Sequence, residues 1–283
     1  MKLLLFLSFI LVYQVALLCQ VYTERDVEIC RTKFKMAKNA NLRSKTIGDV
    51  IAIIGKSFIG TDYKASTLEM EGDERLVINL SGLDCTTFLE NVLVFSRLIK
   101  KDASSFDNYL KELTFIRYRN GIINQYPSRL HYFTDWIFDN VEKNVIKDIT
   151  KELGGIAVNF HINFMSSHVA LYKQLKENPS FVPLIRTNED SINSRTYYYI
   201  PKNKVSSIEE EFLDGDIIAF TTSVKGLDID HVGIAVRGLD QRVHLLHAPQ
   251  VNNKVHITKE PLSDYIINLK KHTGILVLRA VEP

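Results

Sequence analysis

The sequence predicts an α+β fold in which helices come first and an antiparallel sheet follows. Apolar residues recur at helical spacing in the first half of the chain, as they do from Phe88 to Ile99. In the second half, short apolar runs are separated by turn residues, as they are over residues 215–247. Because helices and strands are segregated along the chain, an alternating βαβ fold is not expected.

The helices are predicted from apolar spacing and from capping or breaking residues. Ser44 is the expected cap of the helix over 46–56, and Asn178-Pro179 ends another. Cys30 is expected to pack inside an amphipathic helix. The predicted helices cover residues 26–36, 46–56, 85–99, 105–115, 134–144 and 169–177, with a further one starting at Pro261.

The strands are predicted from short apolar or aromatic runs that turn residues bound. Gly238-Leu239-Asp240 is expected to form a hairpin turn. Residues 180–196 are expected to form a surface loop. The predicted strands cover residues 197–200, 217–220, 231–236, 242–247 and 275–279.

Composition bounds the class of protein. With 283 residues, 46% hydrophobic and 24% charged, the chain has room for one large globular domain. A net charge of +2 argues against a nucleic-acid-binding protein. The sequence has no His/Cys cluster with metal-ligand spacing, so neither a metal nor a cofactor is expected.

The N-terminus predicts export. Lys2 precedes an apolar run over residues 3–18, and polarity rises at Thr23. This pattern predicts a signal peptide over 1–19 and a mature single domain over 20–283 with an N-terminal helical extension. A retained membrane anchor is disfavoured because the run is short and Gln14 interrupts it. Lipidation of Cys19 is a less favoured alternative, since the preceding Leu18 is bulky.

Cys85 is the candidate nucleophile. It follows Asp84, a favourable N-cap, and so lies at or next to the first helical position. Unpaired N–H groups and the helix dipole stabilise a thiolate there, so we expect the pKa of the thiol to be lowered. A lone cysteine is more often a buried small hydrophobe. The assignment therefore depends on a base elsewhere in the chain.

A predicted hairpin brings two histidines together. If the hairpin is symmetric about Leu239, His231 lies opposite His247 on one face. Two imidazoles paired across strands, downstream of a helix-capped cysteine, supply a base and a polar group that orients it. We expect His231 to be the base and His247 the orienting residue.

Two neighbours of this pair have other expected roles. Gly233 leaves space beside the imidazoles, for the helix that carries Cys85. His244 points to the opposite face and is expected to be structural. The alternative for His231 and His247 is that they are two ordinary structural histidines of a sheet.

The motifs around these residues resemble a known family. Three segments carry the resemblance: Leu83-Asp84-Cys85-Thr86-Thr87-Phe88, Leu130-His131-Tyr132-Phe133-Thr134-Asp135-Trp136 and Gly226-Leu227-Asp228-Ile229-Asp230-His231-Val232-Gly233. They are similar to the DUF1460 family of N-acetylmuramoyl-L-alanine amidase-like proteins, within the papain-like NlpC/P60 cysteine peptidases. The resemblance covers roughly residues 45 to 280. It implies a papain-like fold and a Cys85, His231, His247 triad, although His247 follows His231 at a longer spacing than in many NlpC/P60 members.

The segment from Tyr126 to Trp136 is the candidate substrate wall. Its aromatic residues could face a sugar ring and Arg129 a carboxylate, although such aromatic stripes are more often core. With the resemblance, Arg129, Tyr132 and Trp136 are the expected substrate contacts. Asp84 and Asp230, next to the nucleophile and the base, are included with them.

These expectations combine into a function. We expect an exported cysteine amidohydrolase, periplasmic or extracellular, that acts on peptidoglycan or muropeptides near the sugar end of the stem peptide. No membrane span is expected after signal cleavage. One alternative is an NlpC/P60-type endopeptidase that cleaves after D-Glu. Another is a non-catalytic cell-wall-binding module, which an intact set of Cys85, His231 and His247 disfavours.

Overall fold

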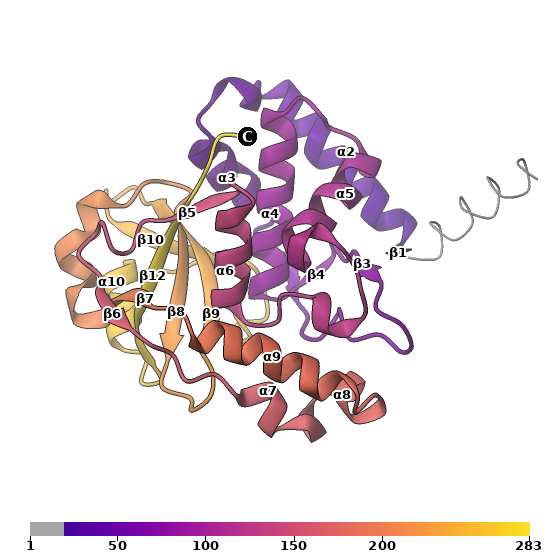
Figure 1. Cartoon of the computed structure of the whole chain (residues 1–283). Coiled ribbons are helices and arrows are strands. Elements are labelled where there is room, and N and C mark those ends of the chain that lie inside the picture. Colours follow the sequence, from indigo (N-terminus) through magenta and orange to yellow (C-terminus); the bar gives the residue numbers. More distant parts are fainter. Residues whose placement is uncertain (1–19) are drawn as a thin grey trace, which may run out of the picture.

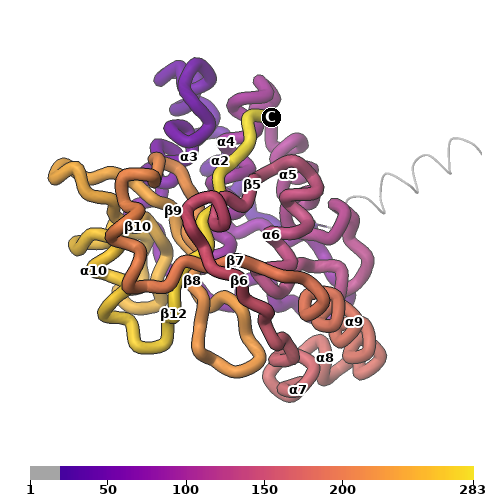
Figure 2. The backbone as a smooth tube through the Cα atoms, turned by 60° about the vertical axis from the view of Figure 1, so that its left-hand side comes forward, coloured from indigo at the N-terminus to yellow at the C-terminus, as the bar shows by residue number. Residues whose placement is uncertain are grey.

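The computed structural model describes residues 20–283, and it has the predicted order of a helical half followed by an antiparallel sheet (Figure 1). The predicted signal peptide and Cys19 lie outside the described residues. An eight-stranded sheet has the order β11-β10-β9-β8-β12-β7-β6, and β5 also pairs with β12. The helices α2 to α5 lie on one face of this sheet, and α10 lies on the other (Figure 2).

The helices agree with most of the predicted ranges. Those of the first half are α2 (Glu24–Asn39), α3 (Ile47–Lys56), α4 (Cys85–Lys100), α5 (Phe106–Arg117) and α6 (Phe133–Glu142). Those of the second half are α7 (Phe164–Ser167), α8 (Lys173–Glu177), α9 (Phe181–Asn193) and α10 (Leu262–Ile267).

The strands fall into one large sheet and two short parallel pairs. The pairs are β1 (Gln20–Val21) with β3 (Leu76–Val77) and β2 (Asp62–Tyr63) with β4 (Gly82–Leu83). The large sheet contains β5 (Ile146–Asp148), β6 (Ile156–Val158), β7 (Tyr197–Pro201), β8 (Ile217–Thr222), β9 (Ile229–Arg237), β10 (Val243–His247), β11 (His256–Ile257) and β12 (His272–Ala280).

Helix α4 is the centre of the helical half. All its residues from Thr87 to Ile99 are buried, because α2, α3 and α5 pack around it and β9 lies against it. A helix that is enclosed on every side holds a fixed position in the core. The first residue of α4, Cys85, is therefore held rigidly against the sheet.

The segment between β6 and β7 forms a small helical cap with its own apolar cluster. Ile162, Met165, Leu175, Ile185 and Ile192 are buried in it. The surface loop predicted over 180–196 is wrong, because α9 occupies most of it. The predicted helix over 169–177 is interrupted at Tyr172, where the backbone is extended.

One further local prediction is corrected and another is confirmed. Thr46, not Ser44, caps α3, because the Thr46 side chain accepts a hydrogen bond from the Asp49 N–H. Cys30 packs in the core as expected, with its thiol free.

Within residues 20–283, no helix is long and apolar enough to cross a membrane. The same residues include no cluster of three or more His, Cys, Asp or Glu side chains placed to hold a metal.

Candidate active site

Cys85 is the first residue of α4, and Asp84 is its N-cap, as predicted. The Asp84 carboxylate accepts a hydrogen bond from the Thr87 N–H at 2.8 Å, and the Asp84 N–H donates to the Thr87 hydroxyl at 2.9 Å. This reciprocal cap satisfies two backbone groups and fixes the start of the helix. The thiol is thereby held at a defined place at the end of α4.

The thiol of Cys85 is half-buried between polar neighbours. The Thr86 hydroxyl lies 4.0 Å from the sulfur, and the Val232 backbone N–H lies beside it. Burial and the Asp84 carboxylate raise the pKa of the thiol to about 11, against the lowering effect of the Val232 and Thr86 groups. The predicted lowered pKa is therefore wrong for the free protein, because desolvation and a neighbouring anion outweigh the helix terminus.

His231 and His247 are hydrogen-bonded to each other on one face of the sheet. Nε2 of His231 lies 2.7 Å from Nδ1 of His247. The hairpin register differs from the prediction by two residues, since Leu245 pairs with Ala235 and not with Gly233. A shift of two keeps the face of each side chain, so the histidines still meet, but diagonally. A Cβ on Gly233 would lie 2.7 Å from the Leu245 side chain and 3.1 Å from the His247 Cβ, so Gly233 makes room for these two residues and not for the helix.

Both imidazoles are neutral at physiological pH. Burial, with His272 nearby, lowers the pKa of His231 to about 4. Burial, with His231 and His256 nearby, lowers the pKa of His247 to about 2. A neutral imidazole has one nitrogen that accepts a proton, as a general base requires.

The Cys85 thiol lies next to the strand that carries His231. Val232, whose N–H lies beside the Cys85 sulfur, directly follows His231. Among residues 20–283 no hydrogen bond joins the sulfur to the His231 ring, and Nδ1 of His231 has no hydrogen-bond partner. Nδ1 is thus the ring nitrogen that remains free to take a proton.

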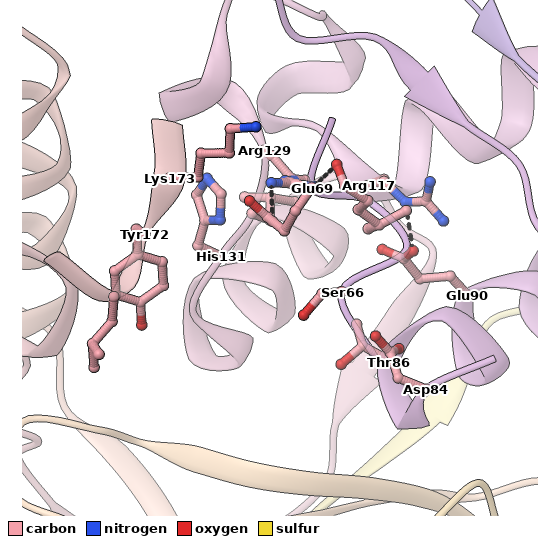
Figure 3. A pocket seen from close by; sticks show the side chains of 13 residues that line it. Ser66, Glu69, Asp84, Thr86, Glu90, Arg117, Arg129, His131, Tyr172 and Lys173 are labelled. Carbon is pink, nitrogen blue, oxygen red and sulfur yellow. Dashed lines mark hydrogen bonds and ion pairs between the residues drawn. The ribbon is translucent and has the colours of Figure 1, made fainter. Parts of the chain in front are cut away.

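A cavity of about 480 Å³ opens beside the start of α4 (Figure 3). Asp84 and Thr86, the two neighbours of Cys85, form part of its wall. The opposite wall carries Arg129 and His131, and the cap supplies Tyr172 and Lys173. The sequence analysis had not singled out Tyr172, Lys173 or Glu69 of this wall, because the cap and the loop over 64–75 reach the cavity only through tertiary packing.

Arg129 lines the cavity, but the protein itself neutralises its charge. Its guanidinium lies 2.6 Å from the Glu69 carboxylate and 3.5 Å from the Glu74 carboxylate, and donates to the Leu68 carbonyl. The side chain is only 5% exposed. Arg129 therefore holds the loop that forms one rim of the cavity.

Two predicted substrate contacts are corrected by burial. Trp136 is fully buried and stacks on Phe133 at 4.8 Å between ring centroids. Tyr132 is also buried, and its hydroxyl donates to Glu189 at 2.7 Å in the cluster beneath the cap. Neither side chain lines the cavity, so neither offers a face to a sugar.

Two further polar residues lie away from the cavity. Asp230 accepts a hydrogen bond from Nε2 of His272 at 2.6 Å and does not line the cavity. His244 bonds the Thr258 carbonyl and the Asp240 carboxylate. The prediction that His244 is structural is confirmed.

Comparison with known proteins finds similarity to amidase-like proteins. Residues 53–275 match the model of the AmiA-like family, described as N-acetylmuramoyl-L-alanine amidase-like. A crystal structure of an N-acetylmuramoyl-L-alanine amidase from Bacteroides uniformis is 38% identical, with a TM-score of 0.78 over 83% of this chain and 98% of that one. No protein of curated function matches the chain.

Two other solved structures are similar. A Bacteroides fragilis protein provisionally named a xylanase is also 38% identical, with a TM-score of 0.73 over 80% of this chain and 98% of that one. A Legionella pneumophila protein of the DUF1460 family shares the fold at 20% identity, with a TM-score of 0.67 over 91% of this chain and 95% of that one.

Proposed function

We propose that this chain, which belongs to the N-acetylmuramoyl-L-alanine amidase-like family, is an exported cysteine amidohydrolase of the papain-like NlpC/P60 type. We propose that it cleaves the amide between the lactyl group of muramic acid and L-Ala. The observation that carries the proposal is the position of Cys85 between two residues that line the cavity, Asp84 and Thr86, and beside Val232, the strand residue that follows His231. The hydrogen bond between Nε2 of His231 and Nδ1 of His247 leaves Nδ1 of His231 for the thiol.

The reaction follows from these positions. The Cys85 sulfur attacks the amide carbonyl carbon while Nδ1 of His231 takes the thiol proton. Since the thiol and the imidazole are both neutral at rest, proton transfer accompanies formation of the S–C bond. The backbone N–H of Cys85 stabilises the oxyanion. His231 then protonates the leaving amine as the C–N bond breaks, and water hydrolyses the thioester to a carboxylic acid.

The cavity suits an anionic peptide attached to a sugar. Lys173, 44% exposed, lies on its rim, and Ser66, Thr86 and Tyr172 supply hydroxyl groups to its wall. Stem peptides of peptidoglycan carry free carboxylates, which a cation and hydroxyl groups bind. The name of the Bacteroides uniformis relative supports the lactyl–L-Ala bond as the scissile one.

A glycosidase reaction is disfavoured by the carboxylates of the cavity. Hydrolysis of a glycosidic bond requires two carboxyl groups that are free to act on the sugar. Glu69 is paired with Arg129, Glu90 is paired with Arg117, and Asp84 caps α4. An endopeptidase that cleaves after D-Glu, using the same Cys85, remains the second candidate, because the chemistry at the thiol is identical.

The test is digestion of defined muropeptides followed by mass spectrometry of the products. We expect release of an intact stem peptide with a free L-Ala amino group. Products cut between D-Glu and the third residue would replace this proposal with the endopeptidase. Cys85→Ala should give no products, while Cys30→Ala, which alters the other free thiol, should retain cleavage. If neither bond is cut and binding persists, the protein is a wall-binding module.

A further inference from the structure

His247 has a buried nitrogen that the proposed triad leaves without a partner. The residue is 1% exposed, and its Nδ1 is engaged with His231. Its Nε2 is buried and has no hydrogen-bond partner among the described residues. An unsatisfied buried polar atom is uncommon in native proteins and requires an explanation.

The protonation of this nitrogen follows from the role of His231. If Nδ1 of His231 accepts the thiol proton, neutral His231 carries its hydrogen on Nε2. That N–H then donates to Nδ1 of His247, which must be bare. A neutral His247 with a bare Nδ1 carries its hydrogen on Nε2. The buried atom without a partner is therefore an N–H group.

Two rings pack against the His247 ring in edge-to-face arrangements. The Tyr265 ring lies 5.6 Å away between centroids at 85°, and the His256 ring lies 4.9 Å away at 66°. Tyr265 comes from α10, and His256 is the partner of His247 across β10 and β11. The face of an aromatic ring accepts a weak hydrogen bond from an N–H group. It repels a nitrogen lone pair, because the ring face and the lone pair are both rich in electrons.

We propose that Tyr265, with His256 as a second wall, is a positioning residue that selects the Nε2–H tautomer of His247. In the opposite tautomer, His247 would donate from Nδ1 to His231. His231 would then carry its hydrogen on Nδ1, toward the thiol, and could not act as a base. The Tyr265 and His256 rings thus determine, through the tautomer of His247, which nitrogen of His231 can accept a proton. They do so without contacting the substrate. This inference rests on the roles proposed for Cys85, His231 and His247.

The tautomer is measured directly in the free protein. Long-range ¹H–¹⁵N correlation spectra of the histidine rings, assigned with His247→Asn, report which nitrogen carries the hydrogen. We expect the Nε2–H form in the wild type and in Tyr265→Phe, which retains the ring. We expect a mixture of tautomers in Tyr265→Leu. A wild-type His247 protonated on Nδ1, or an unchanged tautomer in Tyr265→Leu, would overturn the inference.

Kinetics give the second readout. Tyr265→Leu should lower kcat about fivefold with KM unchanged, which is the loss expected for one weak N–H···π contact. Tyr265→Phe, which keeps the aromatic ring, should retain the wild-type kcat. A kcat that falls equally in both variants would point to the hydroxyl and overturn the inference. Because the spectra need no substrate, the two failures are distinguishable: loss of amidase activity with the Nε2–H tautomer present refutes the proposed function, whereas the spectra alone decide whether Tyr265 selects that tautomer.

Discussion

Nε2 of His231 and Nδ1 of His247 lie 2.7 Å apart, so one hydrogen bond fixes the ring that is proposed to act as the base. The bond distinguishes the two nitrogens of the His231 ring. Nε2 of His231 faces His247, and in the proposed reaction Nδ1 takes the proton of the Cys85 thiol. Because both rings are buried and neutral, neither pairing depends on a charge at rest.

Substitutions should separate the roles of the two histidines. His231→Ala should abolish turnover, because no other group takes the thiol proton. His247→Ala should retain more activity and His247→Asn more still, since an orienting residue needs only an acceptor for the His231 N–H. Steady-state kcat with the folded state checked by circular dichroism is the measurement. His244→Ala is the matched control, and a loss of activity as large as that of His231→Ala would contradict the assignment.

The pH profile of kcat/KM should be broad. His231 is neutral above its pKa of about 4, and Cys85 is a thiol below its pKa of about 11. We therefore expect a plateau from about pH 5 to pH 9, with activity falling on the acid side as His231 gains a proton. An acid limb centred near pH 6.5, the ordinary value for histidine, would show that His231 is not buried as described.

The free energy of unfolding should also decrease as the pH falls toward the pKa of His231. The pKa of His231 is lower in the folded state, about 4, than its ordinary value near 6.5. Between these values the unfolded state binds a proton that the folded state excludes, so stability decreases as pH falls from about 6.5 to 4. Urea unfolding at several pH values measures this slope. His231→Asn should show a shallower decrease, and an identical slope would contradict it.

Thiol labelling should distinguish the two cysteines of the described chain. Cys30 is fully buried, and burial raises the pKa of its thiol to about 12, so it should not react in the folded protein. Cys85 is half-buried and should label with iodoacetamide faster than Cys30. Its rate should still increase above about pH 9, because only the thiolate reacts. A rate that is already constant near pH 7 would indicate a thiolate–imidazolium pair at rest.

Arg129→Ala should destabilise the protein and loosen the rim of the cavity. It leaves the Glu74 carboxylate, 4% exposed, without its cation, and breaking such a buried pair costs about 3–5 kcal/mol. The expected result of chemical denaturation is a loss in that range, accompanied by a higher KM. Lys173→Ala is the control for stability only, because its pair with Glu71 is exposed and worth at most about 1 kcal/mol. Equal stability of both variants would show that Arg129 does not hold the loop.

The sequence predicted the parts of the site that local patterns determine. Asp84 as a cap, Cys85 at the helix start and the shared face of His231 and His247 depend on short-range geometry, and all three are confirmed. The hairpin register was wrong by two residues, but the face was right because side chains alternate with a period of two.

The features that the sequence did not predict depend on tertiary contacts. The pKa of Cys85 depends on how deeply α4 is packed, which no local pattern records. Helix α9 was missed although Pro183 lies in its first turn, where proline is tolerated. Trp136 was assigned to a sugar although its place in the core makes it inaccessible.

The most direct test of the central claim is the mass of the covalent intermediate. Wild-type protein is mixed with a defined muropeptide, quenched in acid within milliseconds and analysed by intact and peptide mass spectrometry. The account predicts an N-acetylmuramoyl thioester on Cys85, with the stem peptide released as a free amine. An acyl group composed of L-Ala and D-Glu, an adduct on another residue, or product formation by Cys85→Ala would contradict it.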